Sequence, residues 1–228
     1  MFEEWELGQH MVVVGQTGAG KTFGVKNGLL PFAMSKAGRI VIIDVEEGFD
    51  FPEKIFKARS VGTALRWAKE DKPFVARVEF DLGLDKDGNI NPDVVEHQFN
   101  ILAGGLLDRG GHDLFLYIDE SSHFSPGGRA FPAYDALMTR ARKRNISIVS
   151  GCQRPQLLSK VVYTQSIFKW FYFTDAYDVE GWLQRSATPI FERMDEIPYK
   201  SYRSLLQNPG GKIDLWEPVP KYDWGAWE

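Results

Sequence analysis

Short runs of apolar residues, many of them β-branched, alternate along the chain with longer stretches in which apolar residues recur at helical spacing. The apolar runs predict buried strands at residues 12–14, 39–45, 74–80, 114–118, 146–150 and 167–173. The amphipathic stretches predict helices at residues 22–34, 60–69, 94–107, 133–144 and 179–185. This alternation predicts an α/β fold with a mostly parallel central sheet flanked by helices. We expect one domain over residues 1–228, with its core at about residues 8–185 and an aromatic, Pro-rich extension at about residues 208–228.

The first apolar run leads directly into a loop with the spacing Gly-x-x-x-x-Gly-Lys-Thr. Its glycines let the backbone bend closely round an anion, and the helix that follows points its positive end at the same place. Lys21 can reach the β- and γ-phosphates of a nucleotide, and the Thr22 hydroxyl can bind magnesium. The predicted nucleotide-binding residues are Gly15, Gln16, Thr17, Gly18, Ala19, Gly20, Lys21 and Thr22. The sequence therefore predicts a site for a nucleoside triphosphate with Mg²⁺.

The apolar run at residues 114–118 ends in two carboxylates, Asp119 and Glu120. Ligands of open α/β sheets bind at the carboxyl ends of the strands. We predict that Asp119 holds the magnesium ion, partly through water, and that Glu120 is the general base that polarises the attacking water. An acidic pair after a strand can also be a solvated loop, but the phosphate-binding loop upstream favours the catalytic interpretation. The chain is therefore predicted to hydrolyse its nucleotide and not merely to bind it.

The strand predicted at residues 146–150 has a cluster of cations before it and a polar amide after it. Gln153 is a candidate sensor that hydrogen-bonds the γ-phosphate or the lytic water. Arg140, Arg142, Lys143 and Arg144 close the preceding helix, where α-helical spacing would put Arg140 and Arg144 on one face. Two interpretations stay open: cations favour a helix carboxyl end, or one arginine reaches a neighbouring subunit's nucleotide or a DNA phosphate.

Charge and composition limit the remaining possibilities. The formal net charge of −4 gives no global case for nucleic-acid binding, so any such contact must come from local basic residues, for which Arg129 and Lys86 are candidates. No apolar run approaches the roughly 18 residues that a membrane-spanning helix needs. Cys152 is the only cysteine, which excludes an internal disulfide.

Three segments resemble the FtsK–HerA branch of the phosphate-loop ATPases, over roughly residues 8–185. They are the loop preceded by Gly8-Gln-His10, the acidic pair followed by His123, and, most specifically, Ile146-Ser-Ile-Val-Ser-Gly-Cys-Gln-Arg-Pro155. The small size resembles the genome-packaging ATPases of icosahedral viruses with an internal membrane. One departure is that Asp44-Val-Glu-Glu-Gly48 stands where many members have an Asp followed closely by Lys-Gly. A lysine-mediated role is therefore not expected there.

The resemblance implies a RecA-like core that hydrolyses ATP with Mg²⁺ and works in a homo-oligomeric ring, usually hexameric. Such a ring drives double-stranded DNA through its centre. The resemblance also implies that Gln153 lies beside the phosphate loop as a sensor, and that Arg142 or Arg144 is the finger that crosses the subunit interface. For a packaging motor it further implies a location in the host cytoplasm, with capsid or membrane-vertex proteins as additional partners.

Other functions remain open at this point. One is an assembly or secretion ATPase, like the phosphate-loop morphogenesis proteins of filamentous phages, and another is a cellular HerA-like DNA translocase. A nucleotide-gated interaction module is disfavoured, because a switch does not need a base such as Glu120. The aromatic residues of the C-terminal extension either dock on a partner or fold back on their own domain, and we favour the second. They are Trp216, Tyr222, Trp224 and Trp227.

Overall fold

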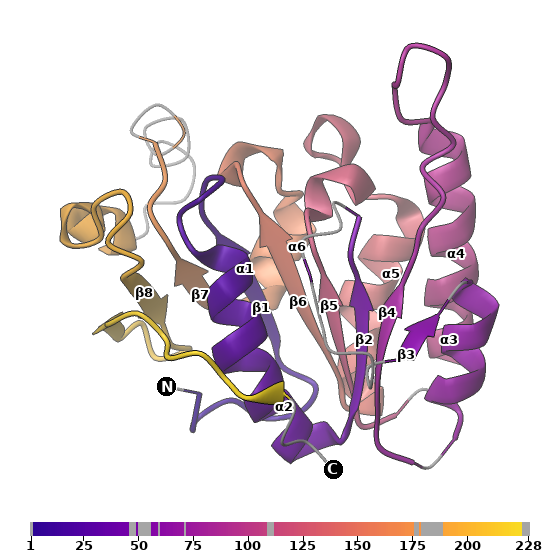
Figure 1. The fold of residues 1–228 in the computed structure, drawn as a ribbon, viewed down its shortest axis with the longest axis horizontal. Helices are drawn as coiled ribbons and strands as arrows, with labels where there is room; N and C mark the ends of the chain where they lie inside the picture. Colours follow the sequence, from indigo (N-terminus) through magenta and orange to yellow (C-terminus); the bar gives the residue numbers. More distant parts are fainter. Residues whose placement is uncertain are drawn as a thin grey trace.

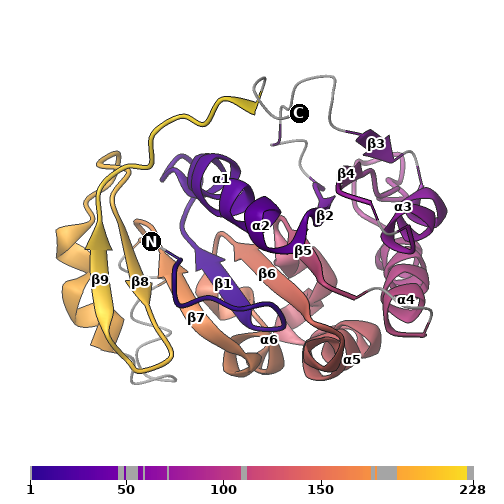
Figure 2. The same cartoon turned by 90° about the horizontal axis from the view of Figure 1, so that it is seen from below.

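The computed structural model describes residues 2–45, 49, 56–58, 60–70, 72–108, 112–175, 178 and 189–224. Within these residues nine strands form one sheet in the order β3-β4-β2-β5-β6-β1-β7-β8-β9 (Figures 1 and 2). All neighbouring strands are parallel except the pairs β7–β8 and β8–β9, which are antiparallel. The strands are β1 (His10–Val14), β2 (Arg39–Ile43), β3 (Phe56–Ala58), β4 (Phe74–Val78), β5 (Leu114–Ile118), β6 (Ile146–Cys152), β7 (Ser166–Phe171), β8 (Ser204–Gln207) and β9 (Ile213–Trp216). The predicted α/β fold with a mostly parallel sheet is confirmed.

Helices cover both faces of this sheet: α1 and α2 lie on one face, and α3 to α6 lie on the other (Figure 2). The α-helices are α1 (Lys21–Gly24), α2 (Leu30–Ala37), α3 (Val61–Ala68), α4 (Pro92–Asp108), α5 (Pro132–Arg140) and α6 (Lys160–Gln165). A π-helical segment, η1 (Val25–Leu29), joins α1 to α2. The remaining short helices are η2 (Ser121–Phe124), η3 (Pro126–Gly128), η4 (Ala141–Arg144), η5 (Pro155–Leu157) and η6 (Pro189–Glu196).

The two faces of the sheet explain why the strand sequences are continuously apolar. In β1, Val12 and Val14 belong to the apolar cluster under α3 to α6, whereas Met11 and Val13 belong to the cluster under α1 and α2. A strand covered on both sides has no solvent face, so its sequence need not alternate with polar residues.

The structure differs from the predicted elements mainly at their ends. The strand at residues 39–45 stops at Ile43, and the helix at residues 133–144 is α-helical only to Arg140. Because η4 continues from there as a 3₁₀ helix, the expectation that Arg140 and Arg144 share an α-helical face is wrong. The helix predicted at residues 179–185 lies outside the described residues. The short elements β3, α6, η6, β8 and β9 were not predicted.

A buried histidine joins β1 to its neighbours. His10 is 3% exposed, its Nδ1 accepts a hydrogen bond from the backbone N–H of Ile148 (3.1 Å), and its Nε2 lies 3.0 Å from the carbonyl of Met138. These partners require a neutral ring with its proton on Nε2. Burial lowers the pKa of His10 from 6.5 to about 4, and the charge of Arg142 adds to this effect.

This histidine predicts a specific dependence of stability on pH. Between pH 6.5 and 4 the unfolded chain binds a proton at His10 that the folded chain does not, so acidification favours unfolding. We expect the wild type to lose about 2 kcal/mol relative to a His10→Gln variant between pH 7 and pH 5. Urea unfolding of both proteins at the two pH values measures this difference. Other titrating groups are common to both proteins, and parallel pH profiles would contradict the prediction.

Candidate nucleotide-binding site

Three adjacent central strands bring the predicted site together at their carboxyl ends. β5, β6 and β1 are neighbours and parallel, so their carboxyl ends lie side by side (Figure 1). The phosphate loop follows β1, the acidic pair follows β5, and Gln153 follows β6. The carboxyl edge of an open α/β sheet is where such folds bind their ligands.

The loop after β1 is held in shape by the backbone and by close neighbours. The N–H of Gly15 donates to the carbonyl of Cys152 (3.1 Å), and the N–H of Gln16 donates to the carbonyl of Phe173 (3.0 Å). Gly20 has φ +100°, and a Cβ atom on Gly15 would lie 2.7 Å from the Cβ of Tyr172. Both positions therefore require glycine. Helix α1 begins directly afterwards at Lys21, so the amino end of the helical stretch Lys21 to Ala37 faces the loop.

Asp119 is a buried carboxylate at the end of β5. Its Oδ1 accepts a hydrogen bond from the hydroxyl of Tyr117 (2.9 Å), and its N–H donates to the carbonyl of Ile43 (2.8 Å). Burial raises the pKa of Asp119 to about 6; the charge of Lys21 and the Tyr117 hydrogen bond lower it, and Asp44 and Glu120 raise it further. The carboxylate is therefore mostly ionised at neutral pH and is fixed in orientation by the tyrosine.

Glu120 faces the phosphate loop across the sheet edge. Its Oε2 lies 3.6 Å from the Nζ of Lys21, and its Oε1 accepts a hydrogen bond from the hydroxyl of Ser122 (2.7 Å). The residue is 5% exposed and has a left-handed backbone with φ 48°. A non-glycine residue in this region is strained, and such strain is concentrated at functional sites.

Gln153 connects the acidic pair to the loop. Its side-chain Oε1 accepts a hydrogen bond from the hydroxyl of Thr17 (2.8 Å), and its backbone N–H lies 3.4 Å from the Oε1 of Glu120. The structure thus brings the loop, Asp119, Glu120 and Gln153 together. Cys152, just before Gln153, is fully buried, and burial raises the pKa of its thiol to about 12, so it is no nucleophile at neutral pH.

The residues at this edge fit a magnesium-bound triphosphate. A pocket of about 330 Å³ is lined by Gln16, Thr17, Gly18, Gly20, Lys21, Thr22, Phe23, Asp119, Gln153 and Tyr202. The glycine loop supplies backbone N–H groups and Lys21 a buried ammonium group for phosphate oxygens. The Thr22 hydroxyl and the Asp119 carboxylate are oxygen ligands of the kind that Mg²⁺ takes.

Arg142 and Arg144 lie at the amino ends of the strands, opposite the phosphate loop. Arg144 precedes the first residue of β6 and Gln153 follows its last residue, so the seven residues of that strand separate them by on the order of 20 Å. Arg142 is exposed, and its backbone carbonyl lies 3.1 Å from the Cβ position of Gly8. Neither arginine is near the phosphate loop of its own chain. Arg129 and Lys86 are exposed in loops that follow β5 and β4, at the same edge as the phosphate loop.

Some site residues were not predicted. Tyr117 orients Asp119, and Asp44 pairs with Arg77 (Nε to Oδ2, 2.8 Å) while contributing to the raised pKa of Asp119. Tyr117 stands two residues before Asp119, a spacing at which strand residues share a face, so the sequence held a signal for it. Tyr202 comes from the turn before β8, and no sequence feature ties it to the loop.

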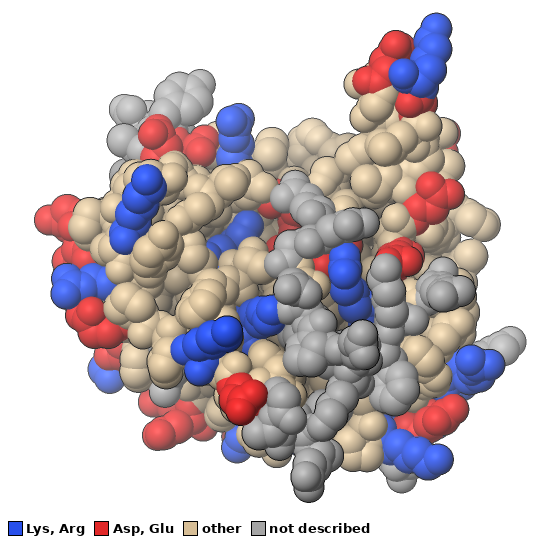
Figure 3. Space-filling view, viewed as in Figure 1, with Lys and Arg blue, Asp and Glu red and all other residues tan. Residues whose placement is uncertain are grey.

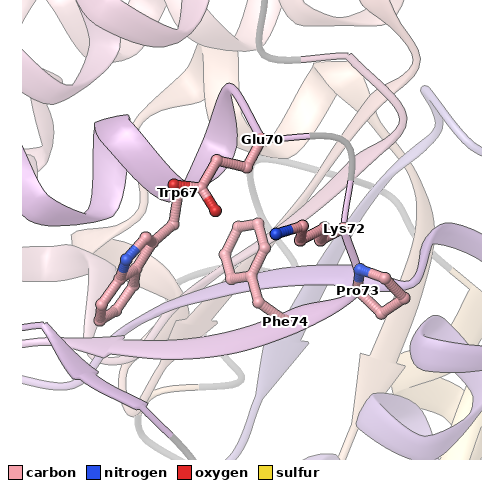
Figure 4. Close-up of a pocket in the computed structure, with 5 residues that line it drawn as sticks. All are labelled: Trp67, Glu70, Lys72, Pro73 and Phe74. Carbon is pink, nitrogen blue, oxygen red and sulfur yellow. The ribbon is translucent and has the colours of Figure 1, made fainter.

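A second pocket, of about 260 Å³, lies at the amino edge of the sheet, next to the first residue of β4 (Figure 4). It is lined by Trp67, Glu70, Lys72, Pro73 and Phe74, and the Lys72 side chain points toward the Phe74 ring. It has no glycine loop and no paired carboxylates, and it lies far from the phosphate loop. It is therefore not part of the nucleotide site.

The described residues form no large basic area on the face in Figure 3, where Lys and Arg are interspersed with Asp and Glu. This agrees with the formal charge of −4. Among the helices in the described ranges, none combines the length and the apolar character required to cross a bilayer.

The fold and the loop together define a RecA-like P-loop ATPase fold, and the comparisons with solved structures agree. The genome packaging NTPase B204 of Sulfolobus turreted icosahedral virus 2, in complex with ATP-gammaS, has a TM-score of 0.71 at 19% identity, covering 93% of this chain and 98% of B204. The DNA-packaging ATPase B204 of Sulfolobus turreted icosahedral virus gives 0.70 at 18%, covering 95% and 100%. VirB4 of Thermoanaerobacter pseudethanolicus gives 0.64 at 12%, covering 94% and 90%.

These similarities establish the fold, and at that level the predicted resemblance to genome-packaging ATPases is confirmed. No family model matches the chain, and no curated protein sequence matches it.

Proposed function

We propose that the chain is a Mg²⁺-dependent ATPase and that hydrolysis drives double-stranded DNA through a ring of identical subunits, as a genome-packaging motor. The observation that carries the proposal is the arrangement of the glycine loop opposite two buried carboxylates, with Lys21 3.6 Å from Glu120. This arrangement can hold a polyphosphate and activate water against it at the same place.

The roles of the residues follow from their positions. The loop N–H groups and Lys21 bind and orient the phosphates, and Thr22 and Asp119 would hold the metal. The bound Mg²⁺ would neutralise charge on the phosphate oxygens. Glu120, held by Ser122, accepts the proton of the attacking water. A phosphate group would compete with Glu120 for Lys21. Binding of the nucleotide would therefore break the ion pair between Lys21 and Glu120 and free the Glu120 carboxylate to act as the base. Gln153, bonded to Thr17, senses the γ-phosphate through the loop.

The motor part of the proposal rests on the fold and on the arginines. The chain shares its fold, over nearly its whole length, with a genome packaging NTPase and a DNA-packaging ATPase. Arg142 and Arg144 lie too far from the loop of their own subunit to act there, so a finger role for either requires a neighbouring subunit in a ring. We propose one ATPase domain over residues 1–228, acting in the host cytoplasm with capsid or membrane-vertex proteins as further partners.

The test is the rate of phosphate release from Mg-ATP with and without double-stranded DNA. We expect stimulation of at least about fivefold by duplexes of unrelated sequence, and a steep loss of DNA binding between 50 and 200 mM salt, because contacts to phosphate release counterions. Hydrolysis that ignores DNA would instead support an assembly or secretion ATPase. The absence of hydrolysis under both conditions would refute the ATPase.

A further inference from the structure

A second hollow adjoins the phosphate pocket and has a different chemistry. It has a volume of about 430 Å³ and shares Gly20, Phe23 and Tyr202 with the phosphate pocket. Its other walls are Gly24, Tyr172, Pro218 and Val219. The two pockets therefore adjoin each other beside the start of α1.

The positions of the phosphate-binding groups indicate which part of a nucleotide would enter this second hollow. Lys21, Asp119 and Gln153 line the phosphate pocket alone. A triphosphate whose γ-phosphate lay at these groups would have its α-phosphate toward Phe23 and Tyr202, which line both pockets. The nucleoside attached to that phosphate then continues into the hollow.

The walls of the hollow suit a flat ring. The side chains of Phe23 and Tyr202 are 48% and 49% exposed, so their faces are available, and Pro218 and Val219 lie with them. Tyr172 is 2% exposed, and its hydroxyl lies against Gly24. In the part of the chain that the structure describes, no Asn, Gln, Asp, Glu, Lys or Arg side chain lines the hollow. Stacking on aromatic faces tolerates any base, whereas telling bases apart requires polar groups at their edges.

The C-terminal extension supplies one wall and is fixed to the helix of the phosphate loop. The N–H of Tyr222 donates to the Oδ1 of Asn27 (3.0 Å), whose Nδ2 donates to the carbonyl of Phe23 (2.9 Å). Val219 packs on Gly28, where a Cβ atom would lie 3.1 Å from its Cγ1. Trp224 is 5% exposed, and the extension runs across the outside of α1 in Figure 2. The described part of the extension thus folds back on its own domain.

We propose that this hollow is the base subsite of the proposed ATPase, that residues 218–219 of the C-terminal extension form its outer wall, and that it binds the base by stacking, without distinguishing adenine from guanine. The inference rests on the proposed function. It names GTP as a second substrate and assigns Tyr202 and Val219 to base binding.

Calorimetric titration with ATP, GTP and inorganic tripolyphosphate, each with Mg²⁺, tests the proposal. We expect ATP and GTP to bind within about threefold of each other, and both at least about tenfold more tightly than tripolyphosphate, because only the nucleotides gain stacking. Tyr202 also lines the phosphate pocket, so the test is the difference between ligands: Tyr202→Ala should weaken both nucleotides by about tenfold more than it weakens tripolyphosphate. Tyr202→Phe, which keeps the ring face, should bind all three like the wild type.

A second variant, Val219→Trp, tests the wall that the C-terminal extension forms. Val219→Trp fills the hollow and should weaken ATP and GTP alike by at least about tenfold, without affecting tripolyphosphate. Tyr163→Ala, in α6 on the other face of the sheet, is the matched control for loss of a tyrosine ring.

Each outcome decides something. GTP binding weaker than ATP binding by more than about thirtyfold would overturn base-blind stacking. Nucleotides that bind no more tightly than tripolyphosphate would overturn the base subsite while leaving the phosphate site intact. If tripolyphosphate also failed to bind, the proposed function itself would fall.

Discussion

The variant Glu120→Gln is expected to bind Mg-ATP at least as tightly as the wild type and to hydrolyse it about a thousandfold more slowly. The amide keeps the size and the left-handed backbone of Glu120, so the fold at this strained position should survive. It cannot accept the proton of the attacking water. It also removes the carboxylate that competes with phosphate for Lys21 at 3.6 Å, which favours nucleotide binding.

Two measurements separate these effects. Steady-state phosphate release gives the loss of turnover, and calorimetric titration of ATP gives the affinity. Glu3→Gln, an exposed carboxylate in the lead-in to β1, is the matched control and should leave both unchanged. If Glu120→Gln hydrolysed ATP as fast as the wild type, Glu120 would not be the general base. A loss of binding together with hydrolysis would instead make Glu120 a structural partner of Lys21.

The sequence predicted those parts of the site whose residues are contiguous. The phosphate loop and the acidic pair each follow an apolar strand, and a strand delivers whatever follows it to the carboxyl edge of a parallel sheet. The strand order that makes β5, β6 and β1 neighbours was not predicted, but each group was predicted to follow its own strand. Local pattern was sufficient because the chemistry lies within one or two residues of the strand ends.

The residues that escaped prediction are distant in sequence from their partners. Tyr202 reaches the loop from the turn before β8, and β8 and β9 have only four residues each, too few for a reliable pattern. β8 and β9 are antiparallel strands added at one edge, and their pairing depends on the turn between them and not on hydrophobic period. Arg142 and Arg144 are close to Gln153 in sequence, yet they lie at the opposite end of β6 from it.

A second large effect is expected at Gly24, in the helix that follows the phosphate loop. A Cβ atom there would lie 1.7 Å from the hydroxyl oxygen of Tyr172 and 2.8 Å from its Cζ. Tyr172 cannot move aside, because it is 2% exposed and its ring packs on Trp170 with a centroid distance of 5.1 Å. Gly24→Ala should therefore lower the free energy of unfolding by about 3 kcal/mol, although alanine is intrinsically the better helix former by about 1 kcal/mol.

Urea unfolding of a small set of variants tests this cause. Gly104→Ala in α4 is the control, since no atom lies within 4 Å of its Cβ position, and it should gain up to about 1 kcal/mol from helix propensity. Combining Gly24→Ala with Tyr172→Phe removes the closest clash, so the double variant should be more stable than the sum of the single losses predicts. Strict additivity would show that the hydroxyl is not what excludes a side chain. The Tyr172 ring and Trp170, whose nearest atoms would lie 2.8 and 3.2 Å from that Cβ position, would then be the cause.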